Sequence, residues 1–224
     1  MISVRMIFLL IVCLVFANQL SAQNYLHKTK SDSGVSSVYS SDEDSIIIDS
    51  DMNFEQALSG INIPESVKKQ LKLITVYYYG FDSKLHQGQL VVNKLAAKDL
   101  IEIFDLILEL KFPVEKVIPI SMYNWSDEAA MKDNNTSGFN YRFVSGTRIL
   151  SKHAAGLAID INPLLNPYVK DGETSPQNSN YDENVPGTIS SNSQITLEFK
   201  IRGWTWGGDW KSLKDYQHFQ KNLK

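Results

Sequence analysis

Residues Ser151–Pro163 read S-K-H-A-A-G-L-A-I-D-I-N-P, and this stretch indicates how the rest of the chain is organised. Gly156 lies between His153 and Asp160 and predicts a turn there instead of a continuous helix. Three aliphatic residues then alternate with small or polar ones, which predicts a strand: Leu157, Ile159 and Ile161. Pro163 ends this strand, because proline cannot donate to the sheet ladder. We therefore expect a turn and a strand to bring His153 and Asp160 to one place.

A third candidate metal ligand lies near the end of the chain, in the segment Asp215–His218, which reads D-Y-Q-H. Two histidines and one carboxylate, with a fourth position left for water, form the ligand set of a catalytic zinc ion. We therefore predict that His153, Asp160 and His218 bind one zinc ion. The alternative is an ordinary hydrogen-bonded His–Asp pair, since no rule fixes the sequence distance between such ligands.

Asp215 is the candidate general base, because it stands three residues before His218. A zinc hydrolase needs a carboxylate that takes a proton from the attacking water and passes it to the leaving amine. The competing interpretation is that Asp215 caps a helix beginning at Ser212. The residues alone leave both interpretations open.

Arg142 follows a polar loop, and its guanidinium is a candidate to bind a substrate carboxylate or the oxyanion of a tetrahedral intermediate. The alternative is that Arg142 is an ordinary surface residue without a role in the reaction. Of the other two histidines, His27 falls in a Ser/Asp-rich segment and His86 falls beside an expected hairpin turn. We expect neither of these two histidines to take part in catalysis.

The N-terminus predicts a secretory signal peptide over residues 1–22, because Arg5 precedes an apolar run that ends before small residues. The run is shorter than the roughly 20 residues that span a bilayer. We expect an exported protein, periplasmic or extracellular, with no stable membrane span after cleavage. A retained anchor is the alternative. Cys13, the only cysteine, would leave with the signal, which excludes thiol chemistry in the mature chain.

Residues 23–52 are rich in Ser, Asp and Glu and predict a disordered tether. The folded domain is expected over residues 53–224. Its hydrophobic content, 43% for the whole chain, is sufficient for a core. The net charge of −3 and the lack of a Lys/Arg cluster give no indication of nucleic-acid binding.

Together these motifs resemble the D-alanyl-D-alanine metallopeptidase superfamily, which includes VanX/VanY-type carboxypeptidases and phage L-alanyl-D-glutamate endolysin-like peptidases. The resemblance runs from about residue 64 to residue 219. It is carried by the opening stretch, by N-N-T-S-G-F-N-Y-R before it, and by W-G-G-D-W and D-x-x-H-F after it.

The resemblance implies zinc on His153, Asp160 and His218, with Asp215 as the general base. It places Arg142 near the scissile carbonyl and Ser151 in contact with the substrate. Many family members carry glutamate where this chain has Asp215, so the shorter side chain would need a different backbone position.

The resemblance also implies an α+β fold with a small antiparallel sheet, flanked by helices and carrying a zinc cleft, as in hedgehog and D,D-peptidase domains. The expected function is hydrolysis of peptidoglycan stem peptides by an exported zinc peptidase, first of all a D-alanyl-D-alanine carboxypeptidase. The alternatives are an L-alanyl-D-glutamate endopeptidase and a catalytically inactive, zinc-containing cell-wall-binding module.

Overall fold

The structure is a computed structural model that describes residues 45–223. The expected signal peptide, the expected tether up to residue 44 and His27 lie outside the described residues. Residues 45–52, which the sequence analysis assigned to the tether, are within the described part of the chain.

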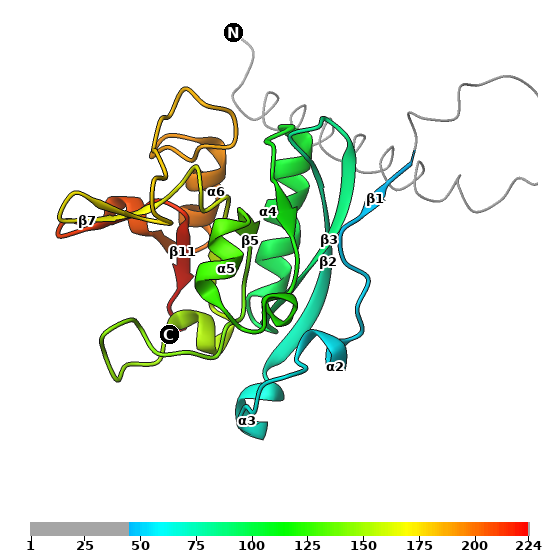
Figure 1. The fold of residues 1–224 in the computed structure, drawn as a ribbon. Helices are drawn as coiled ribbons and strands as arrows, with labels where there is room; N and C mark the ends of the chain where they lie inside the picture. The colour runs from blue at the N-terminus through cyan, green and yellow to red at the C-terminus, as the bar shows by residue number, and fades with distance from the viewer. Residues whose placement is uncertain (1–44, 224) are drawn as a thin grey trace, which may run out of the picture. The chain divides into compact units, whose positions relative to one another are not determined.

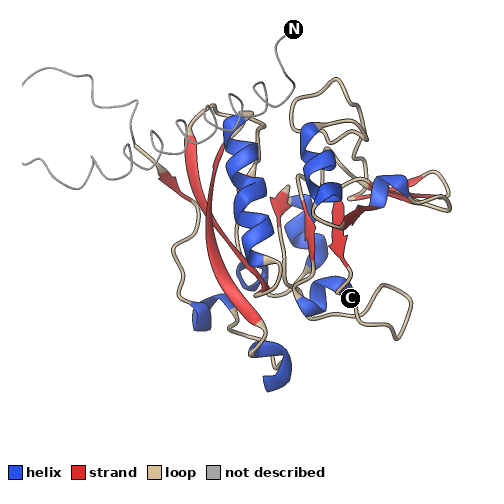
Figure 2. Ribbon diagram, turned by 180° about the vertical axis from the view of Figure 1, so that it is seen from behind, coloured by secondary structure: helices blue, strands red, loops and turns tan. Residues whose placement is uncertain are grey.

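A long hairpin and one helix form the larger layer, and Figure 2 shows the helix lying along the hairpin. β2 (Leu71–Tyr79) pairs antiparallel with β3 (Leu85–Asn93) over its whole length. α4 (Ala97–Glu109) packs against this hairpin. The facing side chains form the main core: Ile74, Val76, Tyr78, Leu90, Val92, Leu100, Ile103, Phe104 and Ile107. The hairpin expected beside His86 is therefore present, and an amphipathic helix packs against it.

The segment before residue 53 is bound to β3. β1 (Ile47–Ile48) pairs parallel with β3, and α2 (Phe54–Ala57) follows. Gln89 Oε1 accepts hydrogen bonds of 2.7 Å from both the Ser50 hydroxyl and the Met52 backbone N–H. The sequence interpretation placed these residues in the tether, whereas here their polar groups find partners on the sheet.

Short elements connect the hairpin layer to the rest of the unit. They are α3 (Glu65–Lys68), β4 (Lys116–Val117), η1 (Ile120–Tyr123), α5 (Asp127–Lys132) and β5 (Asn135–Thr136). α3 follows Pro64 and is short, because β2 begins at Leu71. Ser126 caps α5, since its side chain accepts from the Ala129 N–H at 3.2 Å.

The strand predicted after Gly156 belongs to a second, antiparallel sheet in the order β6-β11-β9. Its members are β6 (Ala158–Asp160), β11 (His218–Lys221) and β9 (Trp204–Trp206). α6 (Gln194–Ile201) packs against this sheet, with Phe199 stacked on Phe219 at 3.8 Å between ring centroids. Leu157, Ile159 and Ile161 are buried in the main core, as their alternation predicts.

The long polar segment after β6 contains two strands. Residues 166–193 read as a loop in sequence, but their first part forms a hairpin of β7 (Tyr168–Lys170) and β8 (Glu173–Ser175). β7 also pairs with β10 (Lys214–Asp215), which places Asp215 opposite Tyr168. Asp215 therefore lies in a strand and does not cap a helix.

The fold class is α+β, as expected, but the sheet arrangement differs from the expected single antiparallel sheet. Among residues 45–223, the strands form four small sheets, and two of them contain parallel pairs. No helix in this part of the chain is long and apolar enough to cross a membrane. Figure 1 shows that β7 and β11, far apart in sequence, lie on the same side of α4.

Candidate metal centre

The register of β6 and β11 brings two of the predicted ligands together. Asp160 and His218 are direct cross-strand partners in this antiparallel pair. Directly opposite residues project from the same face of a sheet with Cβ atoms about 5 Å apart. The next residue of β11, Phe219, faces the core and is fully buried. The alternation of the strand therefore directs His218 to the face that carries Asp160.

A tight turn supplies the third candidate ligand. His153 lies in η2 (Lys152–Ala155), and its own N–H donates to the side chain of the capping residue Ser151. Gly156 ends the turn with a positive φ of 66°, and a Cβ there would lie 2.5 Å from the Asn93 backbone nitrogen. Glycine is required at this position by both the conformation and the close approach. The turn is thereby fixed against the end of β3.

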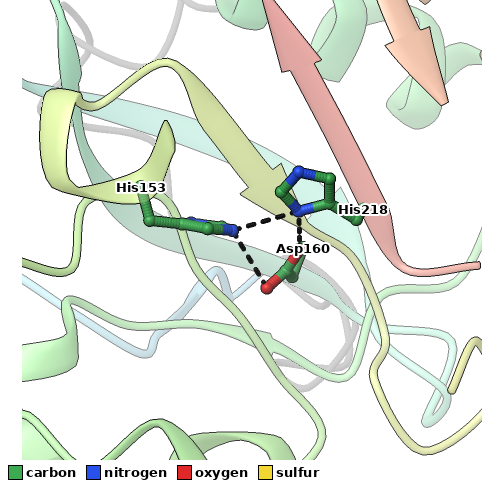
Figure 3. A group of neighbouring side chains, drawn as sticks. All are labelled: His153, Asp160 and His218. Carbon is green, nitrogen blue, oxygen red and sulfur yellow. Dashed lines mark hydrogen bonds and ion pairs between the residues drawn. The ribbon is translucent and has the colours of Figure 1, made fainter. Parts of the chain in front are cut away.

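The three side chains converge, as Figure 3 shows. His153 Nε2 lies 3.2 Å from His218 Nδ1 and 3.2 Å from Asp160 Oδ2. His218 Nδ1 lies 2.9 Å from Asp160 Oδ1. Ligand atoms about 2.1 Å from one tetrahedral ion lie about 3.4 Å from each other. The triangle therefore has nearly the size that a single bound ion requires, and all three residues are buried.

The outer nitrogens of both rings already have acceptors. His153 Nδ1 lies 2.5 Å from the Gly138 carbonyl oxygen, which can only accept, so Nδ1 carries the hydrogen. His218 Nε2 lies 3.1 Å from Gln220 Oε1 and donates to it in the same way. The inner nitrogens are then left with lone pairs that point at each other and at a carboxylate. Three converging acceptors fit a cation, and an oxygen acceptor behind each histidine is typical of metal sites.

Without a metal ion, a proton takes the place of the cation. Burial acts to lower the pKa of His218, but the hydrogen bond and the negative charge of Asp160 outweigh it and raise that pKa to about 9. Burial acts to raise the pKa of Asp160, yet His153 and His218 hold it below its usual value. A proton on His218 and a metal ion therefore compete for the same position.

Asp215 is half-buried in β10, and its Oδ1 atom is buried without a hydrogen-bond partner in the described part of the chain. Burial raises its pKa to about 6; the positive charge of His218 opposes this shift and the negative charge of Asp160 adds to it. A carboxyl group with a pKa near neutrality suits proton transfer at physiological pH. The structure thus gives the candidate base an environment that fits its predicted role.

The glycine–tryptophan segment before β10 holds Asp215 in position. A Cβ on Gly207, the first residue of η3 (Gly207–Asp209), would lie 2.4 Å from the Asp215 carbonyl oxygen. Trp206 Nε1 donates to the Tyr216 carbonyl at 2.8 Å. The W-G-G-D-W motif therefore permits β10 to pass close by and binds the backbone beside Asp215.

Arg142 and Ser151 are joined through their backbones next to the turn that carries His153. The Ser151 N–H donates to the Arg142 carbonyl at 3.0 Å. The Arg142 guanidinium forms an ion pair of 2.7 Å with Asp127, the first residue of α5. Ser151 is buried, and its hydroxyl accepts from the His153 N–H. The predicted substrate contacts of both residues stay predictions.

Three supporting residues were missed in the sequence: Gly138, Gln220 and Asp127. Gln220 could have been found, because it stands two residues after His218 on the same face of a strand. Gly138 and Asp127 act through contacts distant in sequence and have no local signal. They support the site by accepting from His153 and by binding Arg142, respectively.

Comparison with known proteins supports the resemblance seen in the motifs. A family model described as D-alanyl-D-alanine carboxypeptidase matches residues 145–221, a segment that contains His153, Asp160, Asp215 and His218. No solved structure matches the chain significantly. The match confirms the resemblance carried by the motifs, and the segment holding all three candidate ligands is similar to the metal-dependent D-alanyl-D-alanine metallopeptidases.

Proposed function

We propose that this protein is an exported zinc peptidase that hydrolyses peptidoglycan stem peptides, first of all as a D-alanyl-D-alanine carboxypeptidase. The observation that carries the proposal is the buried triangle of His153 Nε2, Asp160 and His218 Nδ1, whose ligand atoms lie 2.9 to 3.2 Å from one another, close enough to share one ion. The family match over residues 145–221 supports the peptidase class.

Zinc is the proposed ion because of the donor set. Two imidazole nitrogens and one carboxylate oxygen, at separations suited to a tetrahedral ion, are typical of catalytic zinc. Calcium and magnesium prefer sites made of oxygen alone. A zinc ion bound here would supply a Lewis acid that acidifies water and polarises the carbonyl of the scissile bond.

The protein's own residues would move the proton and hold the substrate. Asp215 accepts the proton of the attacking water at its unpaired Oδ1 and returns it to the leaving nitrogen. With a pKa of about 6, Asp215 is mostly ionised, and so able to accept, above that pH. Arg142, whose guanidinium pairs with Asp127, would bind the negatively charged group of the substrate.

An L-alanyl-D-glutamate endopeptidase is the second candidate, and the ion pair between Arg142 and Asp127 favours it. A carboxypeptidase needs a cation for the terminal carboxylate of its substrate, and Asp127 already neutralises part of the Arg142 charge. An endopeptidase has no such requirement. A binding module without catalysis would not need a carboxyl group like Asp215, whose burial is energetically costly.

Digestion of purified muropeptides, followed by mass spectrometry, tests the proposal. Loss of one terminal alanine indicates the carboxypeptidase, whereas a cut after the first alanine indicates the endopeptidase. Both reactions should stop with a chelator and return with added zinc. Muropeptides that stay intact with the zinc-loaded protein would rule out the enzyme, and zinc-dependent binding to cell walls would then support the inactive module.

Three further expectations belong to this proposal. They are a fold of the hedgehog/D,D-peptidase type, export by the segment 1–22, and no nucleic-acid partner. The N-terminal residue of the protein recovered from the periplasm or the medium would test export, since cleavage near Ala22 should leave Gln23 first.

A further inference from the structure

A short hairpin over residues 143–150, directly before η2, exposes several large apolar side chains. Phe143 pairs with Leu150 in an antiparallel bridge, and the Val144 N–H donates to the Ile149 carbonyl at 2.8 Å. All four of these side chains are exposed, and Ile149 is the most exposed of them, at 69%. Figure 1 shows the 143–150 hairpin, in yellow-green, projecting away from the rest of the described domain. No other eight-residue stretch of the described chain exposes as many large apolar residues, and such a concentration indicates an interaction surface.

The apolar side chains occupy both faces of the 143–150 hairpin. Phe143 and Leu150 are direct cross-strand partners, and such partners project from the same face. Val144 and Ile149 form the next pair, and successive residues of a strand point to opposite faces. A flat protein surface would bury one face and leave the other in water. A lipid interface surrounds a segment that enters it, so it can cover both faces.

The charges of the hairpin region favour an anionic partner. Residues 141–155 contain three Arg and Lys residues and no Asp or Glu, although the whole chain has a net charge of −3. Arg142 is paired with Asp127, whereas Arg148 and Lys152 form no ion pair within residues 45–223. Cations beside an apolar surface bind the phosphate groups of anionic lipids. A second copy of the chain, docked through the same hairpin, would instead bring like charges together.

The turn of the hairpin satisfies part of its own polar groups. The Thr147 N–H and hydroxyl both donate to the Val144 carbonyl, at 3.0 and 2.9 Å. The Thr147 hydroxyl also accepts from the Ile149 N–H at 3.1 Å. Polar groups that already have partners within a segment cost less to transfer out of water. The turn can therefore lie among lipid headgroups, and the long Arg148 side chain can reach a phosphate.

We propose that the 143–150 hairpin docks the protein on a membrane surface that contains anionic lipids. The apolar pairs enter the interface between headgroups and acyl chains, and Arg148 and Lys152 contact lipid phosphates. Ser151 follows the hairpin and caps the turn that carries His153, so docking brings this turn close to the membrane. The inference goes beyond the proposed function, because it holds whether or not the protein cleaves peptides.

A fluorophore in the turn of the hairpin reports whether the hairpin leaves water. In the full chain carrying Cys13→Ser, Ser145→Cys is labelled with an environment-sensitive dye, and Ser191→Cys, exposed in another segment, is the control. Vesicles of phosphatidylglycerol and phosphatidylcholine in equal parts should shift the emission to the blue at residue 145 and not at residue 191. Phosphatidylcholine alone should need at least about tenfold more lipid for the same shift. Unchanged emission at residue 145 with both kinds of vesicle would overturn the proposal.

Two matched pairs of variants, made in the chain labelled at residue 145, separate the apolar contribution from the charged one. Ile149→Asp should weaken binding to the mixed vesicles by about tenfold or more, whereas Ile201→Asp, at the exposed end of α6, should leave it unchanged. Arg148→Glu should weaken binding by about tenfold, and Lys72→Glu, exposed in β2, by less than about twofold. Unchanged thermal unfolding would show that the variants are folded. Equal binding within each pair would refute the assignment to the hairpin.

A second copy of the chain covering the hairpin would give a different result. The protein would then sediment as a dimer, and Ile149→Asp would convert it to a monomer. The emission from residue 145 would already be shifted to the blue in the absence of vesicles, and adding them would change it no further. That outcome would overturn membrane docking and assign the hairpin to a contact between copies of this chain.

Discussion

Two histidine clusters in this protein contain the same residue types and differ in where the ring nitrogens point. In the metal centre, His153 and His218 each turn one nitrogen toward Asp160 and toward each other. In the other cluster, His86 lies between two carboxylates that face opposite edges of its ring. Its Nδ1 is 2.9 Å from Asp49, and its Nε2 is 3.1 Å from Asp82.

This difference distinguishes a potential ion-binding site from a cluster with a structural role. We call the cluster of His86, Asp49 and Asp82 the clamp. Both nitrogens of His86 have their own oxygen partner, so no converging set of lone pairs is left for an ion. The Tyr78 ring stacks on His86, and the Tyr78 hydroxyl also donates to Asp49. This cluster ties the segment after β1 to the β2–β3 hairpin. A metal site is thus recognised by convergence of acceptors, and the presence of His and Asp alone does not identify one.

Removing a converging nitrogen should have the largest effect. His153→Ala should lower the zinc content from one ion per chain to nearly none, and peptidase activity should fall by about three orders of magnitude or more. His86→Ala, the matched control, should keep both the zinc and the activity. Metal analysis of the two purified variants and assays on muropeptides would measure this. Full zinc content in His153→Ala would show that the converging nitrogens of the metal centre do not bind the ion.

Asp215→Asn should separate metal binding from turnover. The variant should retain one zinc per chain, because Asp215 is outside the triangle of ligands, while kcat falls by about a hundredfold to ten-thousandfold. Steady-state kinetics on muropeptides with zinc-loaded protein would give kcat. Activity close to that of the wild type would remove Asp215 from its proposed role as the base and leave the metal centre intact.

Gln220 should affect zinc affinity only through its hydrogen bond with His218. Gln220→Leu removes the acceptor of the His218 Nε2 hydrogen and should weaken zinc affinity by about tenfold to a hundredfold. Gln220→Glu keeps an acceptor and should retain the affinity. Competition against a coloured chelator measures both values. Equal affinities in the leucine and glutamate variants would show that the hydrogen bond does not orient the ring.

The parts of the site that follow local rules could be predicted from the sequence. The turn at Gly156, the strand through Asp160 and the burial of its aliphatic face follow from residue types within one short window. His218 could be proposed as the third candidate ligand from its residue type and motif. The contact between His218 and Asp160 depends on the register of β11 against β6. This register could not be predicted from the residues near either position.

Contacts between distant segments account for what could not be predicted. The segment 166–193 looks unstructured because its polar residues show no periodicity, yet β7 is stabilised by pairing with β10 more than forty residues later. Ser50 and His86 are buried because their partners lie on other segments, in β3 for Ser50 and after β1 for His86. From the sequence alone, a buried polar residue resembles a surface residue when its hydrogen-bond partner lies far away along the chain.

Zinc affinity should depend on pH through the proton on His218. Because the metal-free pKa of His218 is raised to about 9, zinc must displace this proton at lower pH, and affinity should fall by up to about tenfold per pH unit below 9. The same proton stabilises the metal-free fold. That contribution is fully present below about pH 6.5 and is lost as the pH rises through 9.

Zinc titrations and thermal unfolding in chelator, each from pH 6 to 10, would measure the two trends. The His86→Ala variant should show the same change in zinc affinity, since His86 lies outside the metal centre. Zinc affinity that is constant between pH 6 and 9 would contradict the assignment of the shared proton to His218.

The smallest effects are expected at the clamp, and they should appear in stability. Asp49 accepts from both His86 and Tyr78 and is largely buried, so Asp49→Asn should lower the free energy of unfolding by about 1–3 kcal/mol. Asp82 is 43% exposed, and solvent screens its contact with His86, so Asp82→Asn should cost less than about 1 kcal/mol. Urea unfolding measures both values, and zinc content should stay at one ion per chain. Equal losses in the two variants would show that burial does not determine the strength of the clamp, and a loss of zinc in either would show that the two clusters are coupled.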